Sequence, residues 1–99
     1  MYKDVKITAI NAIIKINEII KLATKEIIKP GTQVDELQLK FFRHEYETLM
    51  SALQLKNLVY DFVVQDKFVP IKQEYSIIIT YTLTNTQTLE NAEVIAIKI

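Results

Sequence analysis

The sequence is poor in the residues from which most catalytic and cofactor sites are built, with one glycine, one histidine and no cysteine in 99 residues. Glycine lets the backbone approach a ligand closely, histidine titrates near neutral pH, and cysteine supplies a soft nucleophile or metal ligand. Without cysteine there is no disulfide framework and no thiolate metal site. With Gly31 as the single glycine, no glycine-rich loop can hold a phosphate group. We therefore expect no enzymatic activity, no cofactor and no metal.

Long apolar runs are also absent, because no stretch approaches the roughly 20 apolar residues that span a bilayer. The first residues also lack the apolar segment of a signal peptide. We therefore expect no membrane contact and an intracellular location. The 12 basic residues equal the 12 acidic ones, whereas a DNA-binding domain of this size usually has a strong basic excess. This balance argues against a nucleic-acid partner.

What the sequence has in abundance is apolar surface: 49% of its residues are hydrophobic and sixteen are isoleucine. We expect a single domain over residues 1–99. A small core does not easily hide so much apolar surface, so the excess indicates an interface. The charges are unevenly distributed, since residues 1–29 have six lysines against three acids and residues 30–66 have six acids against three bases.

Residues 4–29 have the spacing of an amphipathic helix, which Pro30 and Gly31 would end. Ile7 and Ile14 point away from its apolar face. The alternation over residues 5–9 leaves a strand open as an alternative for the first ten residues. The predicted core-facing stripe consists of Val5, Ala9, Ala12, Ile13, Ile16, Ile20, Ala23 and Ile27.

A second helix is predicted from about residue 34, with Thr32 as its cap and Asp35 three residues later. For Leu55–Val64 we favour a third helix after a break at Asn57, although its β-branched and aromatic residues leave a strand open. The second helix has two apolar bands, so we expect it to be covered on two sides. One band contains Leu37, Phe41, Leu49 and Leu53, and the other contains Leu39, Phe42, Tyr46 and Met50.

The C-terminal third changes to the two-residue period of β-strands. Residues 75–84 alternate between an apolar set and a mostly hydroxyl set, a polar turn is predicted at Asn85–Thr88, and Glu93–Ile99 alternates again. We predict a hairpin from these segments, and Pro70 allows at most a short edge strand before it. The apolar set is Tyr75, Ile77, Ile79, Tyr81 and Leu83, and the other set is Ser76, Ile78, Thr80, Thr82 and Thr84.

These elements predict an α+β fold, in which two or three N-terminal helices pack on a small antiparallel sheet formed by the C-terminal hairpin. A lone hairpin is marginally stable in water, and its free edges invite pairing. The final isoleucine-rich strand would be such an open edge. We therefore predict that a two-fold homodimer completes the sheet, either by joining two sheets or by packing their apolar faces.

The nearest approach to a catalytic motif is the segment His44–Thr48. A zinc-protease helix needs two histidines four residues apart, and here Thr48 occupies the second position. His44, Glu47 and Ser51 share a helix face, but three groups on one helix do not usually set the geometry of a catalytic triad. We interpret them, and the acidic pairs of the chain, as solvated surface residues. The enzymatic alternative is a nuclease that uses His44 with a neighbouring glutamate.

Three segments resemble small proteins of rudiviruses, the rod-shaped viruses of hot-spring crenarchaea: Leu58–Val63 (LVYDFV), Val69–Ile71 (VPI) and Glu74–Tyr81 (EYSIIITY). The length and the order of elements are similar too. This family includes an anti-CRISPR protein directed at the subtype I-D interference complex. The resemblance implies an α+β homodimer in the host cytoplasm, which blocks interference without catalysis by binding the large subunit of the effector complex.

An inhibitor that occupies a surface obtains its affinity from a few aromatic and charged residues. We expect partner contacts at Tyr60, Asp61, Asp66 and Phe68, whose acids would imitate nucleic-acid charge toward a basic protein groove. The alternative function is a small dimeric nucleic-acid-binding regulator. Its phosphate contacts would come from the lysines of the first helix, namely Lys15, Lys21, Lys25 and Lys29.

Overall fold

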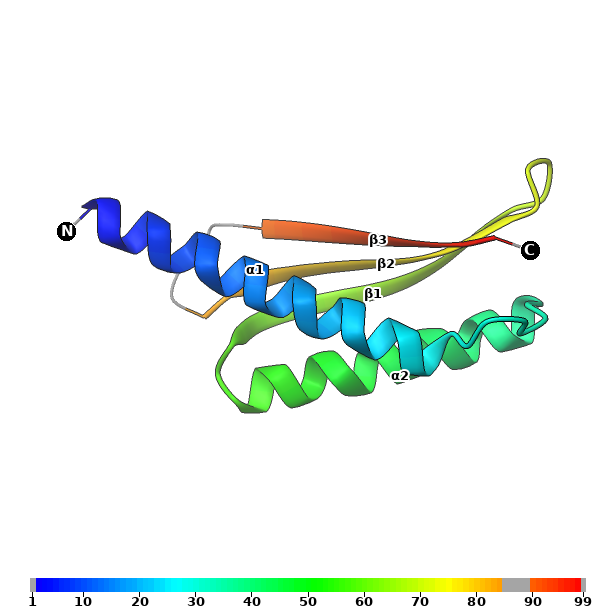
Figure 1. Cartoon of the computed structure of the whole chain (residues 1–99), viewed down its shortest axis with the longest axis horizontal. Coiled ribbons are helices and arrows are strands. Elements are labelled where there is room, and N and C mark those ends of the chain that lie inside the picture. Colours follow the sequence, from blue (N-terminus) through cyan, green and yellow to red (C-terminus); the bar gives the residue numbers. More distant parts are fainter. Residues whose placement is uncertain (1, 85–89, 99) are drawn as a thin grey trace.

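The computed structural model describes residues 2–84 and 90–98, in which two helices precede a three-stranded antiparallel sheet. This arrangement confirms the predicted α+β class. The strands lie in the order β1-β2-β3, and both helices pack on the same face of the sheet (Figure 1). The elements are α1 (Tyr2–Ile27), α2 (Glu36–Leu55), β1 (Val59–Val69), β2 (Glu74–Leu83) and β3 (Glu90–Lys98).

Helix α1 confirms the first predicted helix and decides its first ten residues in favour of helix over strand. Ile16 and Ile20 of the predicted stripe are almost fully buried, and Ile13 packs partly against the core. Ile14 is 51% exposed, as its position off the stripe predicts. The side chains of residues 1–8, which include Val5 and Ile7, lie outside the described set.

Helix α2 begins after Asp35, whose carboxylate Oδ1 accepts a hydrogen bond of 2.7 Å from the Gln38 backbone N–H. The predicted cap at Thr32 is therefore wrong. The Thr32 hydroxyl instead donates to the Lys29 carbonyl beyond the end of α1. Asp35 is the better cap because its side chain reaches the free N–H groups of the first helical turn.

The core-facing side of α2 combines one predicted band with two residues of the other, Leu49 and Leu53. Leu37 and Phe41 of the other band are 79% and 52% exposed, so the prediction of a helix covered on both sides is wrong. The sheet covers α2 from one side only, and the described part of the chain provides no second layer. The buried residues of α2 are Leu39, Phe42, Tyr46 and Met50 of the second predicted band and Leu53 of the first.

The predicted third helix is also wrong, because residues 59–69 form strand β1. Asn57 adopts a left-handed conformation with φ 60°, which turns the chain out of α2. From there the β-branched and aromatic residues pair with β2. The strand before Pro70 is eleven residues long rather than short. Pro70 is tolerated because it lies just beyond this edge strand.

Strands β2 and β3 confirm the predicted hairpin. They pair antiparallel, with Glu74 opposite Lys98 at one end and Thr82 opposite Glu90 at the other. The predicted apolar set of β2 is buried beneath the helices, and the intervening residues are half-buried on the opposite face. The predicted turn at Asn85–Thr88 and the last residue, Ile99, lie outside the described residues.

The fold is elongated, and it measures 48 × 25 × 19 Å. Its radius of gyration is 14.7 Å, which exceeds the value of about 13 Å for a compact domain of this length.

Two hydrogen-bonded tyrosines attach α1 to the rest of the fold. The Tyr46 hydroxyl of α2 donates to the Thr24 hydroxyl at 2.8 Å, and the Tyr81 hydroxyl of β2 donates to Asn17 Oδ1 at 2.7 Å. Asn91 of β3 donates to the Tyr81 oxygen at 3.0 Å. Burial raises the pKa of both tyrosines above its ordinary value, because the phenolate would lose its hydration.

Candidate protein-binding surface

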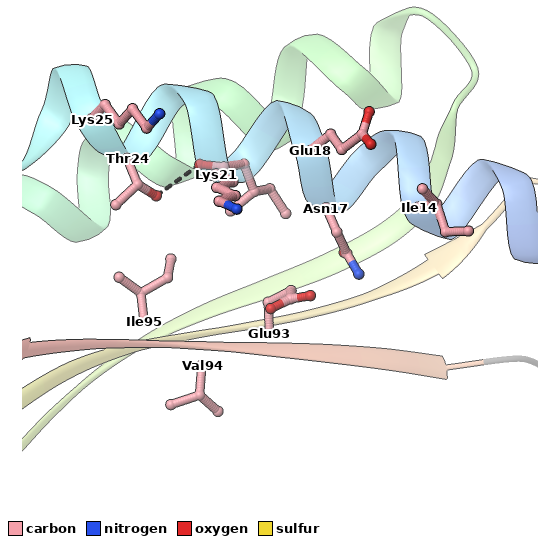
Figure 2. Close-up of a pocket in the computed structure, with 10 residues that line it drawn as sticks. Ile14, Asn17, Glu18, Lys21, Thr24, Lys25, Glu93, Val94 and Ile95 are labelled. Carbon is pink, nitrogen blue, oxygen red and sulfur yellow. Dashed lines mark hydrogen bonds between the residues drawn. The ribbon is translucent and has the colours of Figure 1, made fainter.

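The sheet face opposite the helices is uncovered over the described residues, and we call it the open sheet face. Paired residues of antiparallel strands project to the same face, so the register defines its members. Figure 2 shows Val94 projecting away from α1, whereas Glu93 and Ile95 project toward it. The members in β1 are Asp61, Val63, Gln65 and Lys67, those in β2 are Ser76, Ile78, Thr80 and Thr82, and those in β3 are Glu90, Ala92, Val94 and Ala96.

The open sheet face is uncharged in its middle and charged toward its ends. Asp61 and Glu90 flank Thr82 at one end, and Lys67 lies toward the other. Val63 and Val94 are 53% and 63% exposed, so the middle offers apolar contact area. The four cross-strand rows are Asp61–Thr82–Glu90, Val63–Thr80–Ala92, Gln65–Ile78–Val94 and Lys67–Ser76–Ala96.

A threonine hydroxyl at the acidic end of this face has unmet hydrogen-bonding capacity. Thr82 Oγ1 is buried and finds no hydrogen-bond partner among the described residues, and the same is true of Thr84 Oγ1 just beyond the end of β2. A hollow of about 70 Å³ beside Thr82 is lined by Asp61, Val63 and Glu90. Since an unsatisfied buried polar group costs about 1–3 kcal/mol, a polar contact at this hollow would be favourable.

The structure divides the predicted partner-contact residues between the two faces of β1. Tyr60 is 52% exposed and lies at the register shift between Val59 and Asp61. Asp61 is exposed at the acidic end of the open sheet face, where its carboxylate accepts a hydrogen bond from the Phe62 backbone N–H. Tyr60 and Asp61 are thus both accessible to a partner.

Asp66 and Phe68 face the helices instead, and both already have contacts within the chain. Asp66 Oδ1 accepts a hydrogen bond of 2.8 Å from Arg43 Nη1 of α2. The Phe68 ring stacks on Tyr75 with ring centroids 4.4 Å apart. These two residues therefore hold β1 against α2 and β2, and a contact with another protein at Asp66 would compete with Arg43.

The residues considered for catalysis lie on the solvent side of α2. His44 is exposed, and its carbonyl accepts a hydrogen bond from the Thr48 hydroxyl. Glu47 Oε1 lies 3.3 Å from Arg43 Nε, so this carboxylate is committed to an ion pair. Over the described residues, no three side chains of histidine, aspartate or glutamate gather in an arrangement that would hold a metal ion.

The α1 lysines considered for nucleic-acid binding are exposed, but acidic residues are interspersed with them. Lys15, Lys21 and Lys25 share the exposed surface with Glu18 and Glu26. This mixture of charges provides no continuous basic surface. Neither described helix is both long and apolar enough to cross a membrane.

Comparison of the chain with protein-family models, curated proteins and solved structures finds no match. Of its described surfaces, the open sheet face combines breadth, regularity and exposed apolar side chains. These are the properties of a surface that contacts another protein.

Proposed function

We propose that this chain is a non-enzymatic binding protein, and specifically a viral anti-CRISPR protein. In this proposal it acts as a homodimer in the host cytoplasm, where it binds the large subunit of a subtype I-D interference complex and blocks interference without a cofactor. The particular target follows from the resemblance of Leu58–Val63, Val69–Ile71 and Glu74–Tyr81 to the rudivirus family. The open sheet face supports the mode of action.

The observation that carries the proposal is the uncovered, uncharged middle of the open sheet face. Its exposed valines, Val63 and Val94, flank the half-buried Ile78 of the central strand. Keeping apolar side chains in water is unfavourable, at about 25 cal/mol per Å². A surface of this kind becomes favourable when a partner covers it, and it provides no chemistry beyond contact.

The size of this face supports a homodimer. Three strands of about ten residues span roughly 33 Å by 14 Å, or about 460 Å² in plane. A stable protein–protein interface buries about 800 Å² on each partner. Two protomers side by side would double the plane that is offered to a partner, which favours a homodimer over a single protomer.

The test is binding of the purified protein to the purified large subunit, measured by calorimetry, together with an interference assay. Val63→Lys places a charge in the middle of the open sheet face and should weaken binding about tenfold or more, which is about 1.4 kcal/mol. Ile71→Lys is the matched control, because Ile71 is 97% exposed in the turn between β1 and β2. It should bind as the unaltered protein does.

Asp61→Lys tests the acidic end of the same face. If Asp61 imitates nucleic-acid charge, its reversal weakens binding and reduces the dependence of affinity on salt. Asp66→Lys is less informative because it also breaks the bond to Arg43. Absence of binding to the large subunit refutes the proposed target. Tight DNA binding with a steep salt dependence would instead establish the regulator function.

A further inference from the structure

The two edges of the sheet differ in their protection against pairing with another strand. β1 has a register shift between Val59 and Asp61, an inward-pointing charge at Asp66 and a proline directly after its end. Register shifts, inward charges and prolines are devices by which natural edge strands avoid further pairing. β1 is therefore a protected edge.

β3 lacks most of this protection. Its register with β2 is regular from Glu90 to Lys98, and the four residues Val94–Ile97 are uncharged. Its one inward-pointing charge in the described sheet is Glu93, which projects toward α1 (Figure 2). The outer edge of β3 therefore offers a regular row of backbone N–H and C=O groups to another strand. The added strand has to accommodate a single acidic side chain, Glu93.

A groove of about 580 Å³ lies beside this edge, between β3 and α1 (Figure 2). Ile14, Ile20 and Ile95 supply its apolar lining, and polar residues of α1 form its rim. A free strand edge next to such a groove meets both needs of strand addition. The edge supplies main-chain hydrogen bonds, and the groove takes alternate side chains of the added strand.

The charges around the groove are separated along β3. Figure 2 shows Lys25 near the Ile95 end and Glu18 near the Glu93 end, with Lys21 between them. A strand added antiparallel to β3 begins opposite the C-terminal end of β3, which is the end near Lys25 (Figure 2). An acid near the start of the added strand would therefore lie beside the lysines. β3 itself is a strand of this kind, because Glu93 precedes its uncharged segment.

We propose that the two protomers of the homodimer join through β3, which pairs antiparallel with the partner's β3 about a two-fold axis at Ile95. This inference rests on the homodimer of the proposed function and identifies its interface. In this register Ile95 meets the partner's Ile95, and the partner's Glu93 lies opposite Ile97. The partner's Glu93 then projects to the helix side and reaches Lys25 and Lys21. By symmetry, the same contact forms twice.

The joined sheet has six strands and a continuous open sheet face on one side. By the same geometry this doubles the plane available to a third protein, to about 900 Å². All the helices lie on the other side, because a two-fold axis perpendicular to the sheet keeps both helical layers together. The β3 edge and the open sheet face therefore have separate roles, the first in pairing and the second in recognition.

A charge-reversal series measured by sedimentation equilibrium tests the interface. Glu93→Lys should raise the dimer dissociation constant about tenfold or more, because it places a cation beside two lysines. The double variant Lys21→Glu/Lys25→Glu should raise it similarly. The triple variant that combines all three changes should restore dimerisation toward the original level. Glu90→Lys is the matched control, because Glu90 lies on the open sheet face and should leave the dissociation constant unchanged.

An introduced cysteine tests the register between the two β3 strands. Because the chain has no cysteine of its own, any disulfide must form at the introduced position. Ile95→Cys should form a covalent dimer within the preformed dimer when an oxidant is added, so its cross-linking should not slow on dilution at concentrations where the dimer persists. Ile71→Cys, which is exposed in the turn, should cross-link only by random collision and therefore more slowly as the protein is diluted. A dimer that survives the charge reversals, or that Ile95→Cys does not cross-link, refutes the β3 interface while leaving the homodimer intact. A protein that is monomeric at micromolar concentration refutes the interface and the homodimer together, while its binding to the large subunit is measured separately.

Discussion

The hydrogen bond between Tyr46 and Thr24 provides a sharp test of how α1 is held to α2. The Tyr46 hydroxyl belongs to a fully buried side chain and donates to Thr24 Oγ1, which in turn donates to the Ile20 carbonyl at 2.7 Å. Tyr46→Phe and Thr24→Val each remove the same bond between the helices. The two substitutions differ in what they leave unpaired.

Tyr46→Phe leaves Thr24 bonded to the Ile20 carbonyl, so its cost is that of one ordinary hydrogen bond, about 1 kcal/mol. Thr24→Val leaves the Tyr46 hydroxyl buried without an acceptor, which costs about 1–3 kcal/mol. We therefore expect Thr24→Val to be the more damaging substitution. The double variant should cost less than the sum of the two, because no polar group is then left unpaired.

Urea unfolding followed by far-ultraviolet circular dichroism measures these differences, with all variants at one protein concentration. For a slope of about 2 kcal/mol/M, a loss of 2 kcal/mol lowers the midpoint by roughly 1 M. Equal effects of the two single substitutions, or strictly additive effects in the double variant, would refute the reasoning. The Tyr46 hydroxyl would then have access to water or to another acceptor.

Two further predictions concern the same tyrosines and one strained turn. Burial raises the pKa values of Tyr46 and Tyr81 above the value of about 10 in the unfolded chain. The contribution of the two neutral tyrosines to the free energy of unfolding is therefore complete below about pH 10, and it is lost as the pH rises through the folded pKa values. Urea midpoints measured from pH 8 to 11 should fall less steeply in Tyr46→Phe. Gln73 has φ 49° in the turn between β1 and β2. Gln73→Gly should therefore stabilise the fold by about 0.5 kcal/mol in thermal unfolding, and a lowered midpoint would contradict this.

The parts of the fold that were predictable from sequence are those with a single local period. Residues 75–83 alternate with Ile78 as the one exception, and α1 has one apolar stripe, so both elements were identified. α2 has two bands of equal period, and a helix in isolation cannot show which band faces the sheet. The choice in favour of Phe42 and Tyr46 over Leu37 and Phe41 depends on β1 and β2, which follow later in the chain.

The segment Leu55–Val64 shows a different limit. Its residues are compatible with helix or strand, and the strand forms because β2 offers a pairing partner about twenty residues away. Because the sequence alone favours a helix for this segment, it does not place Val63 on a sheet beside Ile78 and Val94. The apolar middle of the open sheet face was therefore not predicted. The alternation over residues 75–84 did indicate a second, mostly hydroxyl face. The bond between Asp66 and Arg43 had no local signal, because 23 residues separate them.

The order of the elements along the chain has a consequence for synthesis on the ribosome. The helices emerge first, yet their buried side chains pack against strands that are translated afterwards. Most helical stability in proteins comes from tertiary packing of an amphipathic face, so α1 and α2 gain most of their stability only once β1 and β2 have left the exit tunnel. Nascent chains that stop before Glu74 would expose Phe42, Tyr46 and Met50, and would therefore be substrates for chaperones and proteases.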